Sequence, residues 1–126
     1  MNVRMNISNV NDFKPIKFKS QITKIGFVGL GKLGRDVSEV FGEFFDTTGY
    51  DVRPIDINIP VATDLEFAVK GKDVVFVAVQ TPHDEDYDGK YPSSHLKPSD
   101  FDYTIAKDAI SKVDKLVDSQ TLIVLI

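Results

Sequence analysis

The sequence predicts an α/β fold in which a parallel β-sheet carries helices on both faces. Short apolar runs rich in Val, Ile and Phe recur along the chain, and segments with apolar residues at helical spacing lie between them. The runs are almost continuously apolar, which is typical of parallel strands that are buried on both faces. A glycine-rich turn joins the first run to the first helical segment. We therefore expect a Rossmann-type, doubly wound sheet with strand order 3-2-1-4-5, truncated at its fifth strand.

The length and composition predict one soluble globular domain. The chain has 126 residues, of which 42% are hydrophobic and 27% are charged, and these values exclude collagen-like, coiled-coil and wholly disordered chains. Its longest apolar run, within residues 121–126, is far shorter than the roughly 20 residues of a membrane-spanning helix. Cysteine is absent, which excludes disulfides, thiolate metal sites and a cysteine nucleophile. Because residues 1–24 contain no apolar export signal, we expect a cytoplasmic protein without a membrane partner.

The charge is distributed unevenly along the chain. The net charge is −4, but residues 1–24 carry five basic residues and one acidic residue, so the remainder is strongly acidic. An acidic body argues against nucleic acid as a partner, since proteins that bind nucleic acid present a basic surface. We expect residues 1–21 to form a basic, flexible leader and residues 22–126 to form the domain.

The elements of the domain are expected in the following order, given by residue number: a buried strand at 25–28, a helix at 32–46 closed by 47–49, a second strand at 50–57, a short third strand at 59–62, a brief helix at 64–70, a buried fourth strand at 73–79, a polar loop at 83–99, a helix from 100 or 102 to about 117, and a fifth strand at 121–126. In the first helix, apolar residues share one face, and Phe41, Phe44 and Phe45 are expected in the core. Asp64 is expected to cap the second helix, and Asp100 or Asp102 the third.

The turn after the first strand matches the pattern G-x-G-x-x-G. Its glycines are Gly29, Gly31 and Gly34, and a predicted strand precedes it while a predicted helix follows it. In that setting the first glycine permits a tight turn, the second lets a pyrophosphate approach the backbone, and the third lets the helix pack closely on the strand. The helix N-terminus then faces the phosphates. The pattern predicts a dinucleotide site formed by Gly29, Leu30, Gly31, Lys32, Leu33 and Gly34.

An acidic residue about 20 positions further on, at the end of the second strand, would complete such a site. Asp56 follows Gly34 by 22 residues and lies at the end of the predicted second strand. Its carboxylate would accept hydrogen bonds from the ribose hydroxyls and would repel a 2′-phosphate. The sequence therefore predicts NAD, rather than NADP, as the cofactor.

Three further stretches add a family resemblance to this pattern: residues 77–82 (Val-Ala-Val-Gln-Thr-Pro), residues 62–66 (Ala-Thr-Asp-Leu-Glu) and residues 100–103 (Asp-Phe-Asp-Tyr). Together with residues 24–34 and Asp56, they resemble the N-terminal NAD-binding domain of the UDP-glucose/GDP-mannose dehydrogenases. The resemblance places the V-x-T-P element, Val79, Gln80, Thr81 and Pro82, beside the nicotinamide half of NAD. The family commonly has proline where this chain has Gln80.

The resemblance implies two successive NAD-dependent oxidations of a nucleotide sugar, from the C6 alcohol to the carboxylate. In the family this chemistry uses a cysteine thiol and lysine, asparagine and aspartate side chains that follow the fifth strand, and this sequence contains none of those motifs. We therefore assign no catalytic residue and expect the chain alone to be inactive. The expected partners are a dinucleotide, a nucleotide sugar in the full-length enzyme, and a second copy bound at the exposed fifth strand.

Two alternative functions remain open. The chain could belong to a prephenate or 3-hydroxyacid type of dehydrogenase, which shares the G-x-G-x-x-G opening, although the V-x-T-P element favours the first family. It could also be a non-catalytic domain that binds nucleotides or other proteins.

The polar loop contains other candidate residues. Asp84, Asp86, Asp88 and Gly89 match the start of a calcium-binding loop, but His95 stands at the twelfth position, where a glutamate is needed. His83 has no identifiable partner for metal or proton chemistry. We expect a solvated loop and no metal site.

Overall fold

A computed structural model describes residues 21–126, so the leader predicted at residues 1–21 lies outside the described residues except for its last one. The elements are β1 (Lys24–Val28), α1 (Lys32–Gly42), β2 (Asp46–Tyr50), α2 (Leu65–Val69), β3 (Val74–Val77), the short 3₁₀ helix η2 (Glu85–Tyr87), α3 (Thr104–Leu116) and β4 (Leu122–Leu125). No helix in the described part of the chain is both long and apolar enough to span a membrane.

The strands form one parallel sheet in the order β2-β1-β3-β4. The third strand expected at residues 59–62 is reduced to one parallel bridge between Gly49 and Val61, next to β2. The Gly49 N–H donates to Pro60 O at 2.9 Å, and the Ala62 N–H donates to Gly49 O at 2.8 Å. Because proline has no N–H, the segment cannot extend this ladder at Pro60. The doubly wound α/β class is confirmed, with four strands and this bridge in place of five strands.

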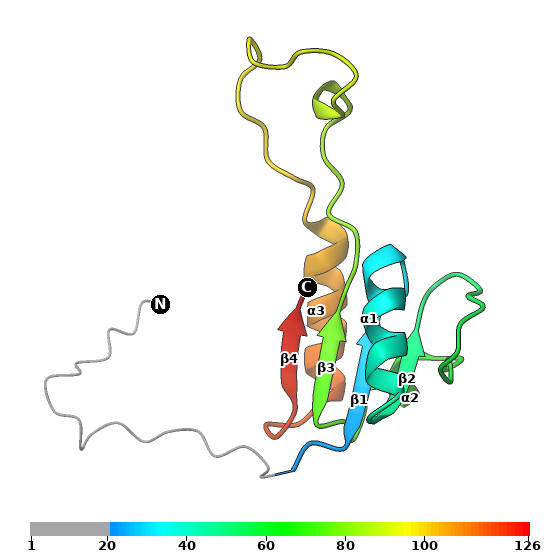
Figure 1. Ribbon diagram of the computed structural model, residues 1–126. Helices are drawn as coiled ribbons and strands as arrows, with labels where there is room; N and C mark the ends of the chain where they lie inside the picture. Colours follow the sequence, from blue (N-terminus) through cyan, green and yellow to red (C-terminus); the bar gives the residue numbers. More distant parts are fainter. Residues whose placement is uncertain (1–20) are drawn as a thin grey trace, which may run out of the picture.

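Helices cover both faces of the sheet, and each face has its own apolar core (Figure 1). On the face of α1, the buried residues are Ile25, Phe27, Leu30 and Ile59. On the opposite face, under α2 and α3, they are Val28, Ala68, Val69, Val75, Val77 and Val113. Successive β1 residues therefore point into different cores, as expected for a strand that is buried on both faces.

The predicted boundary between the first helix and the second strand is wrong. α1 ends at Gly42 rather than at residue 46, and β2 occupies Asp46–Tyr50, where the sequence suggested a turn followed by a strand at 50–57. Gly49 lies within the strand, paired with Phe27, and the Leu30 side chain packs against it so closely that a Cβ there would lie 2.8 Å from Leu30 Cδ1. Pairing with β1 and this contact override the turn preference of Thr-Thr-Gly.

The set of α1 side chains that are buried in the core also differs from the prediction. Phe41 packs against both Phe27 and Phe76, with ring centroids 5.9 and 5.1 Å away. Phe44, however, is 74% exposed, and Phe45 lies at the edge of the core. The buried side of α1 carries the small residues Gly34 and Ser38, so the helix axis lies close to the sheet, and the larger side chains lie at the margin.

The second half of the domain follows the prediction closely. Asp64 caps α2, its Oδ1 accepting from the Phe67 N–H at 2.8 Å. The N-cap of α3 is Tyr103 rather than Asp100 or Asp102, but Asp102, one residue earlier, accepts at Oδ1 from the Thr104 N–H at 2.9 Å. The polar loop at 83–99 extends beyond the carboxyl ends of the strands in Figure 1 and contains η2. The fold therefore places the β1–α1 turn, the end of β2 and the start of this loop at one end of the sheet.

Candidate functional site

The turn between β1 and α1 requires glycine at two positions for steric reasons. Gly29 has φ +95°, and a Cβ there would lie 2.2 Å from the carbonyl oxygen of Ala78. At Gly34 a Cβ would lie 2.1 Å from the carbonyl oxygen of Gly29. Both distances are far below any real Cβ contact. The first glycine therefore permits the turn, and the third lets α1 pack against the end of β1, as the sequence predicts.

Gly31 is surrounded by open space instead, because a Cβ there would meet no atom within 4 Å. Gly31 is also the N-cap of α1, where no side chain caps the helix and the first turn has no acidic residue. The N-terminus of an 11-residue helix carries unpaired N–H groups and the positive end of the helix dipole. The open space beside Gly31 is thus suited to an anion. Lys32 and Leu33, the next two residues of the predicted site, are exposed.

Asp51 is the acidic residue that directly follows β2. Its Oδ2 accepts from the Leu30 N–H at 2.8 Å, and its Oδ1 accepts from the Arg53 N–H at 2.9 Å. Its side chain is only 8% exposed, and Arg53 Nε lies 3.7 Å away. A carboxylate has about four acceptor positions, so Asp51 can accept further bonds from a ligand. Asp51 follows Gly34 by 17 residues, but it is not among the residues predicted from the sequence, because the predicted second strand begins at residue 50.

Asp56 lies in the loop after β2 rather than at the end of that strand. It is exposed, and its backbone carbonyl, not its carboxylate, accepts from Arg35 Nη2 at 2.6 Å. The expectation that Asp56 ends the second strand is therefore wrong, since Asp51 has that position.

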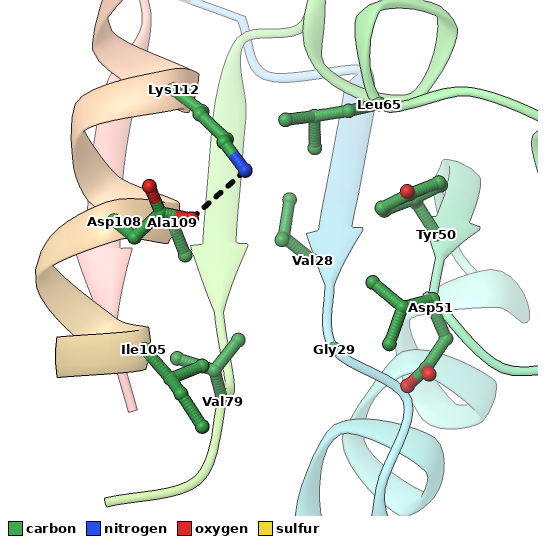
Figure 2. A pocket seen from close by; sticks show the side chains of 11 residues that line it. Val28, Gly29, Tyr50, Asp51, Leu65, Val79, Ile105, Asp108, Ala109 and Lys112 are labelled. Atoms are coloured by element: carbon green, nitrogen blue, oxygen red, sulfur yellow. Dashed lines mark ion pairs between the residues drawn. The ribbon is translucent and has the colours of Figure 1, made fainter.

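A cavity of about 180 Å³ opens between α3 and the carboxyl ends of β1 and β2. Figure 2 shows Gly29 and Asp51 close together at one end of it, with α3 along the opposite wall. Its walls are mostly apolar and include Val28, Tyr50, Leu65, Val79, Ile105 and Ala109. Pockets that enclose a whole drug-sized ligand measure roughly 300–1,000 Å³. This cavity therefore has the size for one flat ring system.

Two charged residues of α3 also line the cavity. Lys112 Nζ lies 2.9 Å from Asp108 Oδ2, one helical turn earlier. The hydrogen bond to Asp108 and the negative charge of that carboxylate raise the pKa of Lys112. The ammonium group therefore remains charged at neutral pH.

The predicted V-x-T-P residues follow β3, and only the first of them lies at the cavity. Val79 lines the cavity, whereas Gln80, Thr81 and Pro82 are exposed at the start of the polar loop. Pro82 O accepts from the Asp102 N–H at 2.8 Å, which ties the start of the loop to its end. The structure thus brings Gly29, Asp51 and Val79 to one cavity and leaves Gln80–Pro82 at the edge of the site.

The aspartates of the polar loop have local structural roles. Asp84 Oδ1 caps η2 by accepting from the Asp86 N–H, and Asp88 Oδ1 accepts from the Lys90 N–H. His83 and His95 are exposed. Within residues 21–126, no group of three or more His, Asp or Glu side chains is arranged to hold a metal ion.

Comparison with known proteins gives similarity in structure only. No family model and no curated protein matches the sequence. Among solved structures, a diketoreductase with substrate-directed dual catalysis of dicarbonyl compounds matches 85% of this chain, with 17% identity and a TM-score of 0.60. The chain has a Rossmann-type fold. It spans 42% of the length of that diketoreductase.

A second solved structure is a probable 2-hydroxyacid dehydrogenase from Rhizobium etli CFN 42, in complex with NADP, HEPES and L(+)-tartaric acid. It matches 89% of this chain and 48% of its own, with 18% identity and a TM-score of 0.39. A similarity of this strength supports no conclusion about this chain.

Proposed function

We propose that this chain is the NAD-binding domain of a dehydrogenase. Three features that lie together at one end of the sheet support this proposal. These are the open N-terminus of α1 at Gly31, the buried carboxylate of Asp51, and the apolar cavity between them and α3. Each feature matches the chemistry of one part of a dinucleotide.

In this proposal the pyrophosphate lies at Gly31, where the helix dipole favours a negative charge. The adenosine ribose donates hydrogen bonds to Asp51, and the adenine ring occupies the apolar cavity. The resemblance to the nucleotide-sugar dehydrogenases implies that the nicotinamide lies along the segment after β3, and because Val79 lines the adenine cavity, we propose that the nicotinamide lies beside Gln80, Thr81 and Pro82. When bound, the dinucleotide would accept a hydride, and this chain would hold and orient it.

The carboxylate of Asp51 favours NAD over NADP, because it would repel a 2′-phosphate on the ribose it binds. Arg53 would favour NADP, since its side chain is 65% exposed and its guanidinium could attract the 2′-phosphate. Arg53 Nε, however, lies near Asp51 Oδ1, so the guanidinium already faces a carboxylate. We therefore propose NAD as the cofactor.

Calorimetric titration with NAD⁺ and NADP⁺ tests this site, using the unaltered chain, Asp51→Asn and the matched control Asp56→Asn. Hydrogen bonds to charged groups contribute about 1.5–3 kcal/mol. We therefore expect Asp51→Asn to weaken NAD⁺ binding about tenfold or more, and Asp56→Asn to leave it unchanged. Thermal unfolding of each variant confirms that it is folded.

Binding of NADP⁺ in preference to NAD⁺ would contradict the specificity proposed for Asp51. If Asp56→Asn weakens NAD⁺ binding and Asp51→Asn does not, Asp56 binds the ribose, as the sequence predicts.

For the enzyme as a whole we propose oxidation of a UDP- or GDP-sugar, on the strength of the residues that resemble that family. A reductase or dehydrogenase of the 3-hydroxyacid type is the second candidate, favoured by the structural similarity to the diketoreductase. Dehydrogenase assays on the full-length protein with a nucleotide sugar and with a 3-hydroxyacid distinguish the two. Turnover of neither, with NAD⁺ binding intact, would favour a non-catalytic binding domain.

We also propose that the chain associates with itself through β4. Within the described residues, β4 pairs with β3 on one side only. Leu122 and Leu125 on this strand are 41% and 58% exposed. An exposed apolar edge strand is a template for pairing with another chain.

A further inference from the structure

Charged side chains line the cavity at two places, and the second of these has no role in the site described so far. Asp51 lies at the end next to the glycine turn, and the ion pair of Asp108 and Lys112 lies on α3. Figure 2 shows Lys112 on the α3 wall, at the same end of the cavity as Leu65 and away from Asp51, with its ammonium group pointing into the cavity. A ligand that fills the cavity would therefore meet a charged group at each end.

The spacing of the pair on α3 determines how it faces the cavity. Asp108 and Lys112 are four residues apart, so they lie on the same side of the helix as Ile105 and Ala109, which also line the cavity. Both charged side chains are 62% exposed, so water and a ligand can reach them. Polar groups placed at the margin of an apolar pocket fix the orientation and identity of a ligand.

We infer that Asp108 and Lys112 together recognise the outer edge of the adenine base. This inference rests on the proposed function, which places adenine in the cavity. The adenine edge presents an amino group at N6, which donates hydrogen bonds, and N1, which accepts them. Asp108 accepts from the N6 amino group, and Lys112 donates to N1.

This arrangement discriminates between purines. Hypoxanthine has a carbonyl oxygen in place of the amino group and an N–H at N1, so its donor and acceptor positions are reversed. The ribose is held at Asp51, so the base cannot turn to present a different edge. Hypoxanthine would place its oxygen against the carboxylate of Asp108 and its N–H against the ammonium of Lys112.

Affinity measurements with NAD⁺ and nicotinamide hypoxanthine dinucleotide test the inference. The unaltered chain is expected to bind NAD⁺ about tenfold more tightly, as for one charge-assisted hydrogen bond. Asp108→Ala and Lys112→Ala are each expected to reduce this preference to about threefold or less by weakening NAD⁺ binding. The matched controls Asp114→Ala and Lys115→Ala, on α3 but not on the cavity, are expected to retain the full preference.

The same measurements separate the role of Asp108 and Lys112 from the proposed NAD binding. If the unaltered chain binds neither dinucleotide, the proposed function is overturned and the inference with it. If NAD⁺ binds but the preference is absent, or persists in both Asp108→Ala and Lys112→Ala, only the inference is overturned.

Discussion

The three glycines of the β1–α1 turn have different physical roles, although they belong to one sequence pattern. Gly29 and Gly34 are required by the fold, since a Cβ at either position would collide with backbone atoms. Gly31 is not required by the fold, because the space around it is open. The open space at Gly31, at the N-terminus of α1, fits the proposed position of the pyrophosphate.

Alanine substitutions at Gly31 and Gly34 are expected to separate binding from stability. Gly34→Ala should lower the free energy of unfolding by about 1–3 kcal/mol or more, because the added Cβ forces the helix away from Gly29. Gly31→Ala should change the free energy of unfolding by less than about 0.5 kcal/mol while weakening NAD⁺ binding. Urea denaturation and calorimetry measure the two effects, and strong destabilisation by Gly31→Ala would contradict the assignment.

The sequence predicts the steric roles of Gly29 and Gly34 correctly and the end of the second strand incorrectly, for a physical reason. The spacing of Gly29, Gly31 and Gly34 is local and follows directly from the turn. The position of Asp51 depends on where β2 ends, and that is decided by pairing with β1 and by the packing of Leu30 on Gly49. Those contacts are long-range, so a single sequence does not reveal them. A search for every acidic residue 15–25 positions after Gly34 would have included Asp51.

At the scale of elements, the start of α3 couples the polar loop to the helix that lines the cavity. Asp102 makes two hydrogen bonds here. Its N–H donates to the carbonyl oxygen of Pro82 in the loop, and its carboxylate accepts from the N–H of Thr104 in α3. The hydrogen bonds from the side chain and the backbone N–H of Thr104 lower the pKa of Asp102 from its ordinary value of 3.8. The carboxylate thus stabilises the folded state above about pH 3.8, and this stabilisation is lost as the pH falls through the lowered pKa.

Asp102→Ala is therefore expected to lower Tm at neutral pH, with a difference from the unaltered chain that shrinks in acid. Asp102→Asn is the matched control, because the amide oxygen can accept the same hydrogen bond without titrating. Its Tm should remain near that of the unaltered chain at pH 7. Thermal unfolding followed by circular dichroism between pH 7 and pH 3 measures the effect. An Asp102→Ala deficit that is constant across this range would contradict the role of the charged carboxylate.

The elements that the sequence predicts best are those with strong local signals. α2, β3, α3 and β4 were expected close to their observed bounds, because Asp64 and Asp102 mark helix starts and β-branched runs mark the strands. The third strand was overestimated, since Pro60 interrupts its hydrogen bonding. The apolar spacing of α1 suggested a wide buried face, but the helix buries Gly34 and Ser38 and leaves Phe44 exposed.

At the scale of the whole molecule, the order β2-β1-β3-β4 leaves one apolar strand at an edge of the sheet. If the chain associates through β4 as proposed, Leu125→Lys, which places a charge on this edge, is expected to weaken that association in sedimentation. Phe67→Lys is the matched control, since Phe67 is 69% exposed on α2, away from β4. An unaltered chain that sediments as a monomer at high concentration would contradict self-association through β4.

The proposed NAD site at one end of this sheet combines the turn at Gly31, the carboxylate of Asp51 and the cavity beside α3. Amide NMR spectra recorded during titration with NAD⁺ test it residue by residue. We expect saturable shifts at Gly31, Asp51 and Ala109, and none at Thr23, which directly precedes β1 at the other end of the strand. An absence of shifts, or shifts confined to the polar loop at residues 83–99, would contradict it.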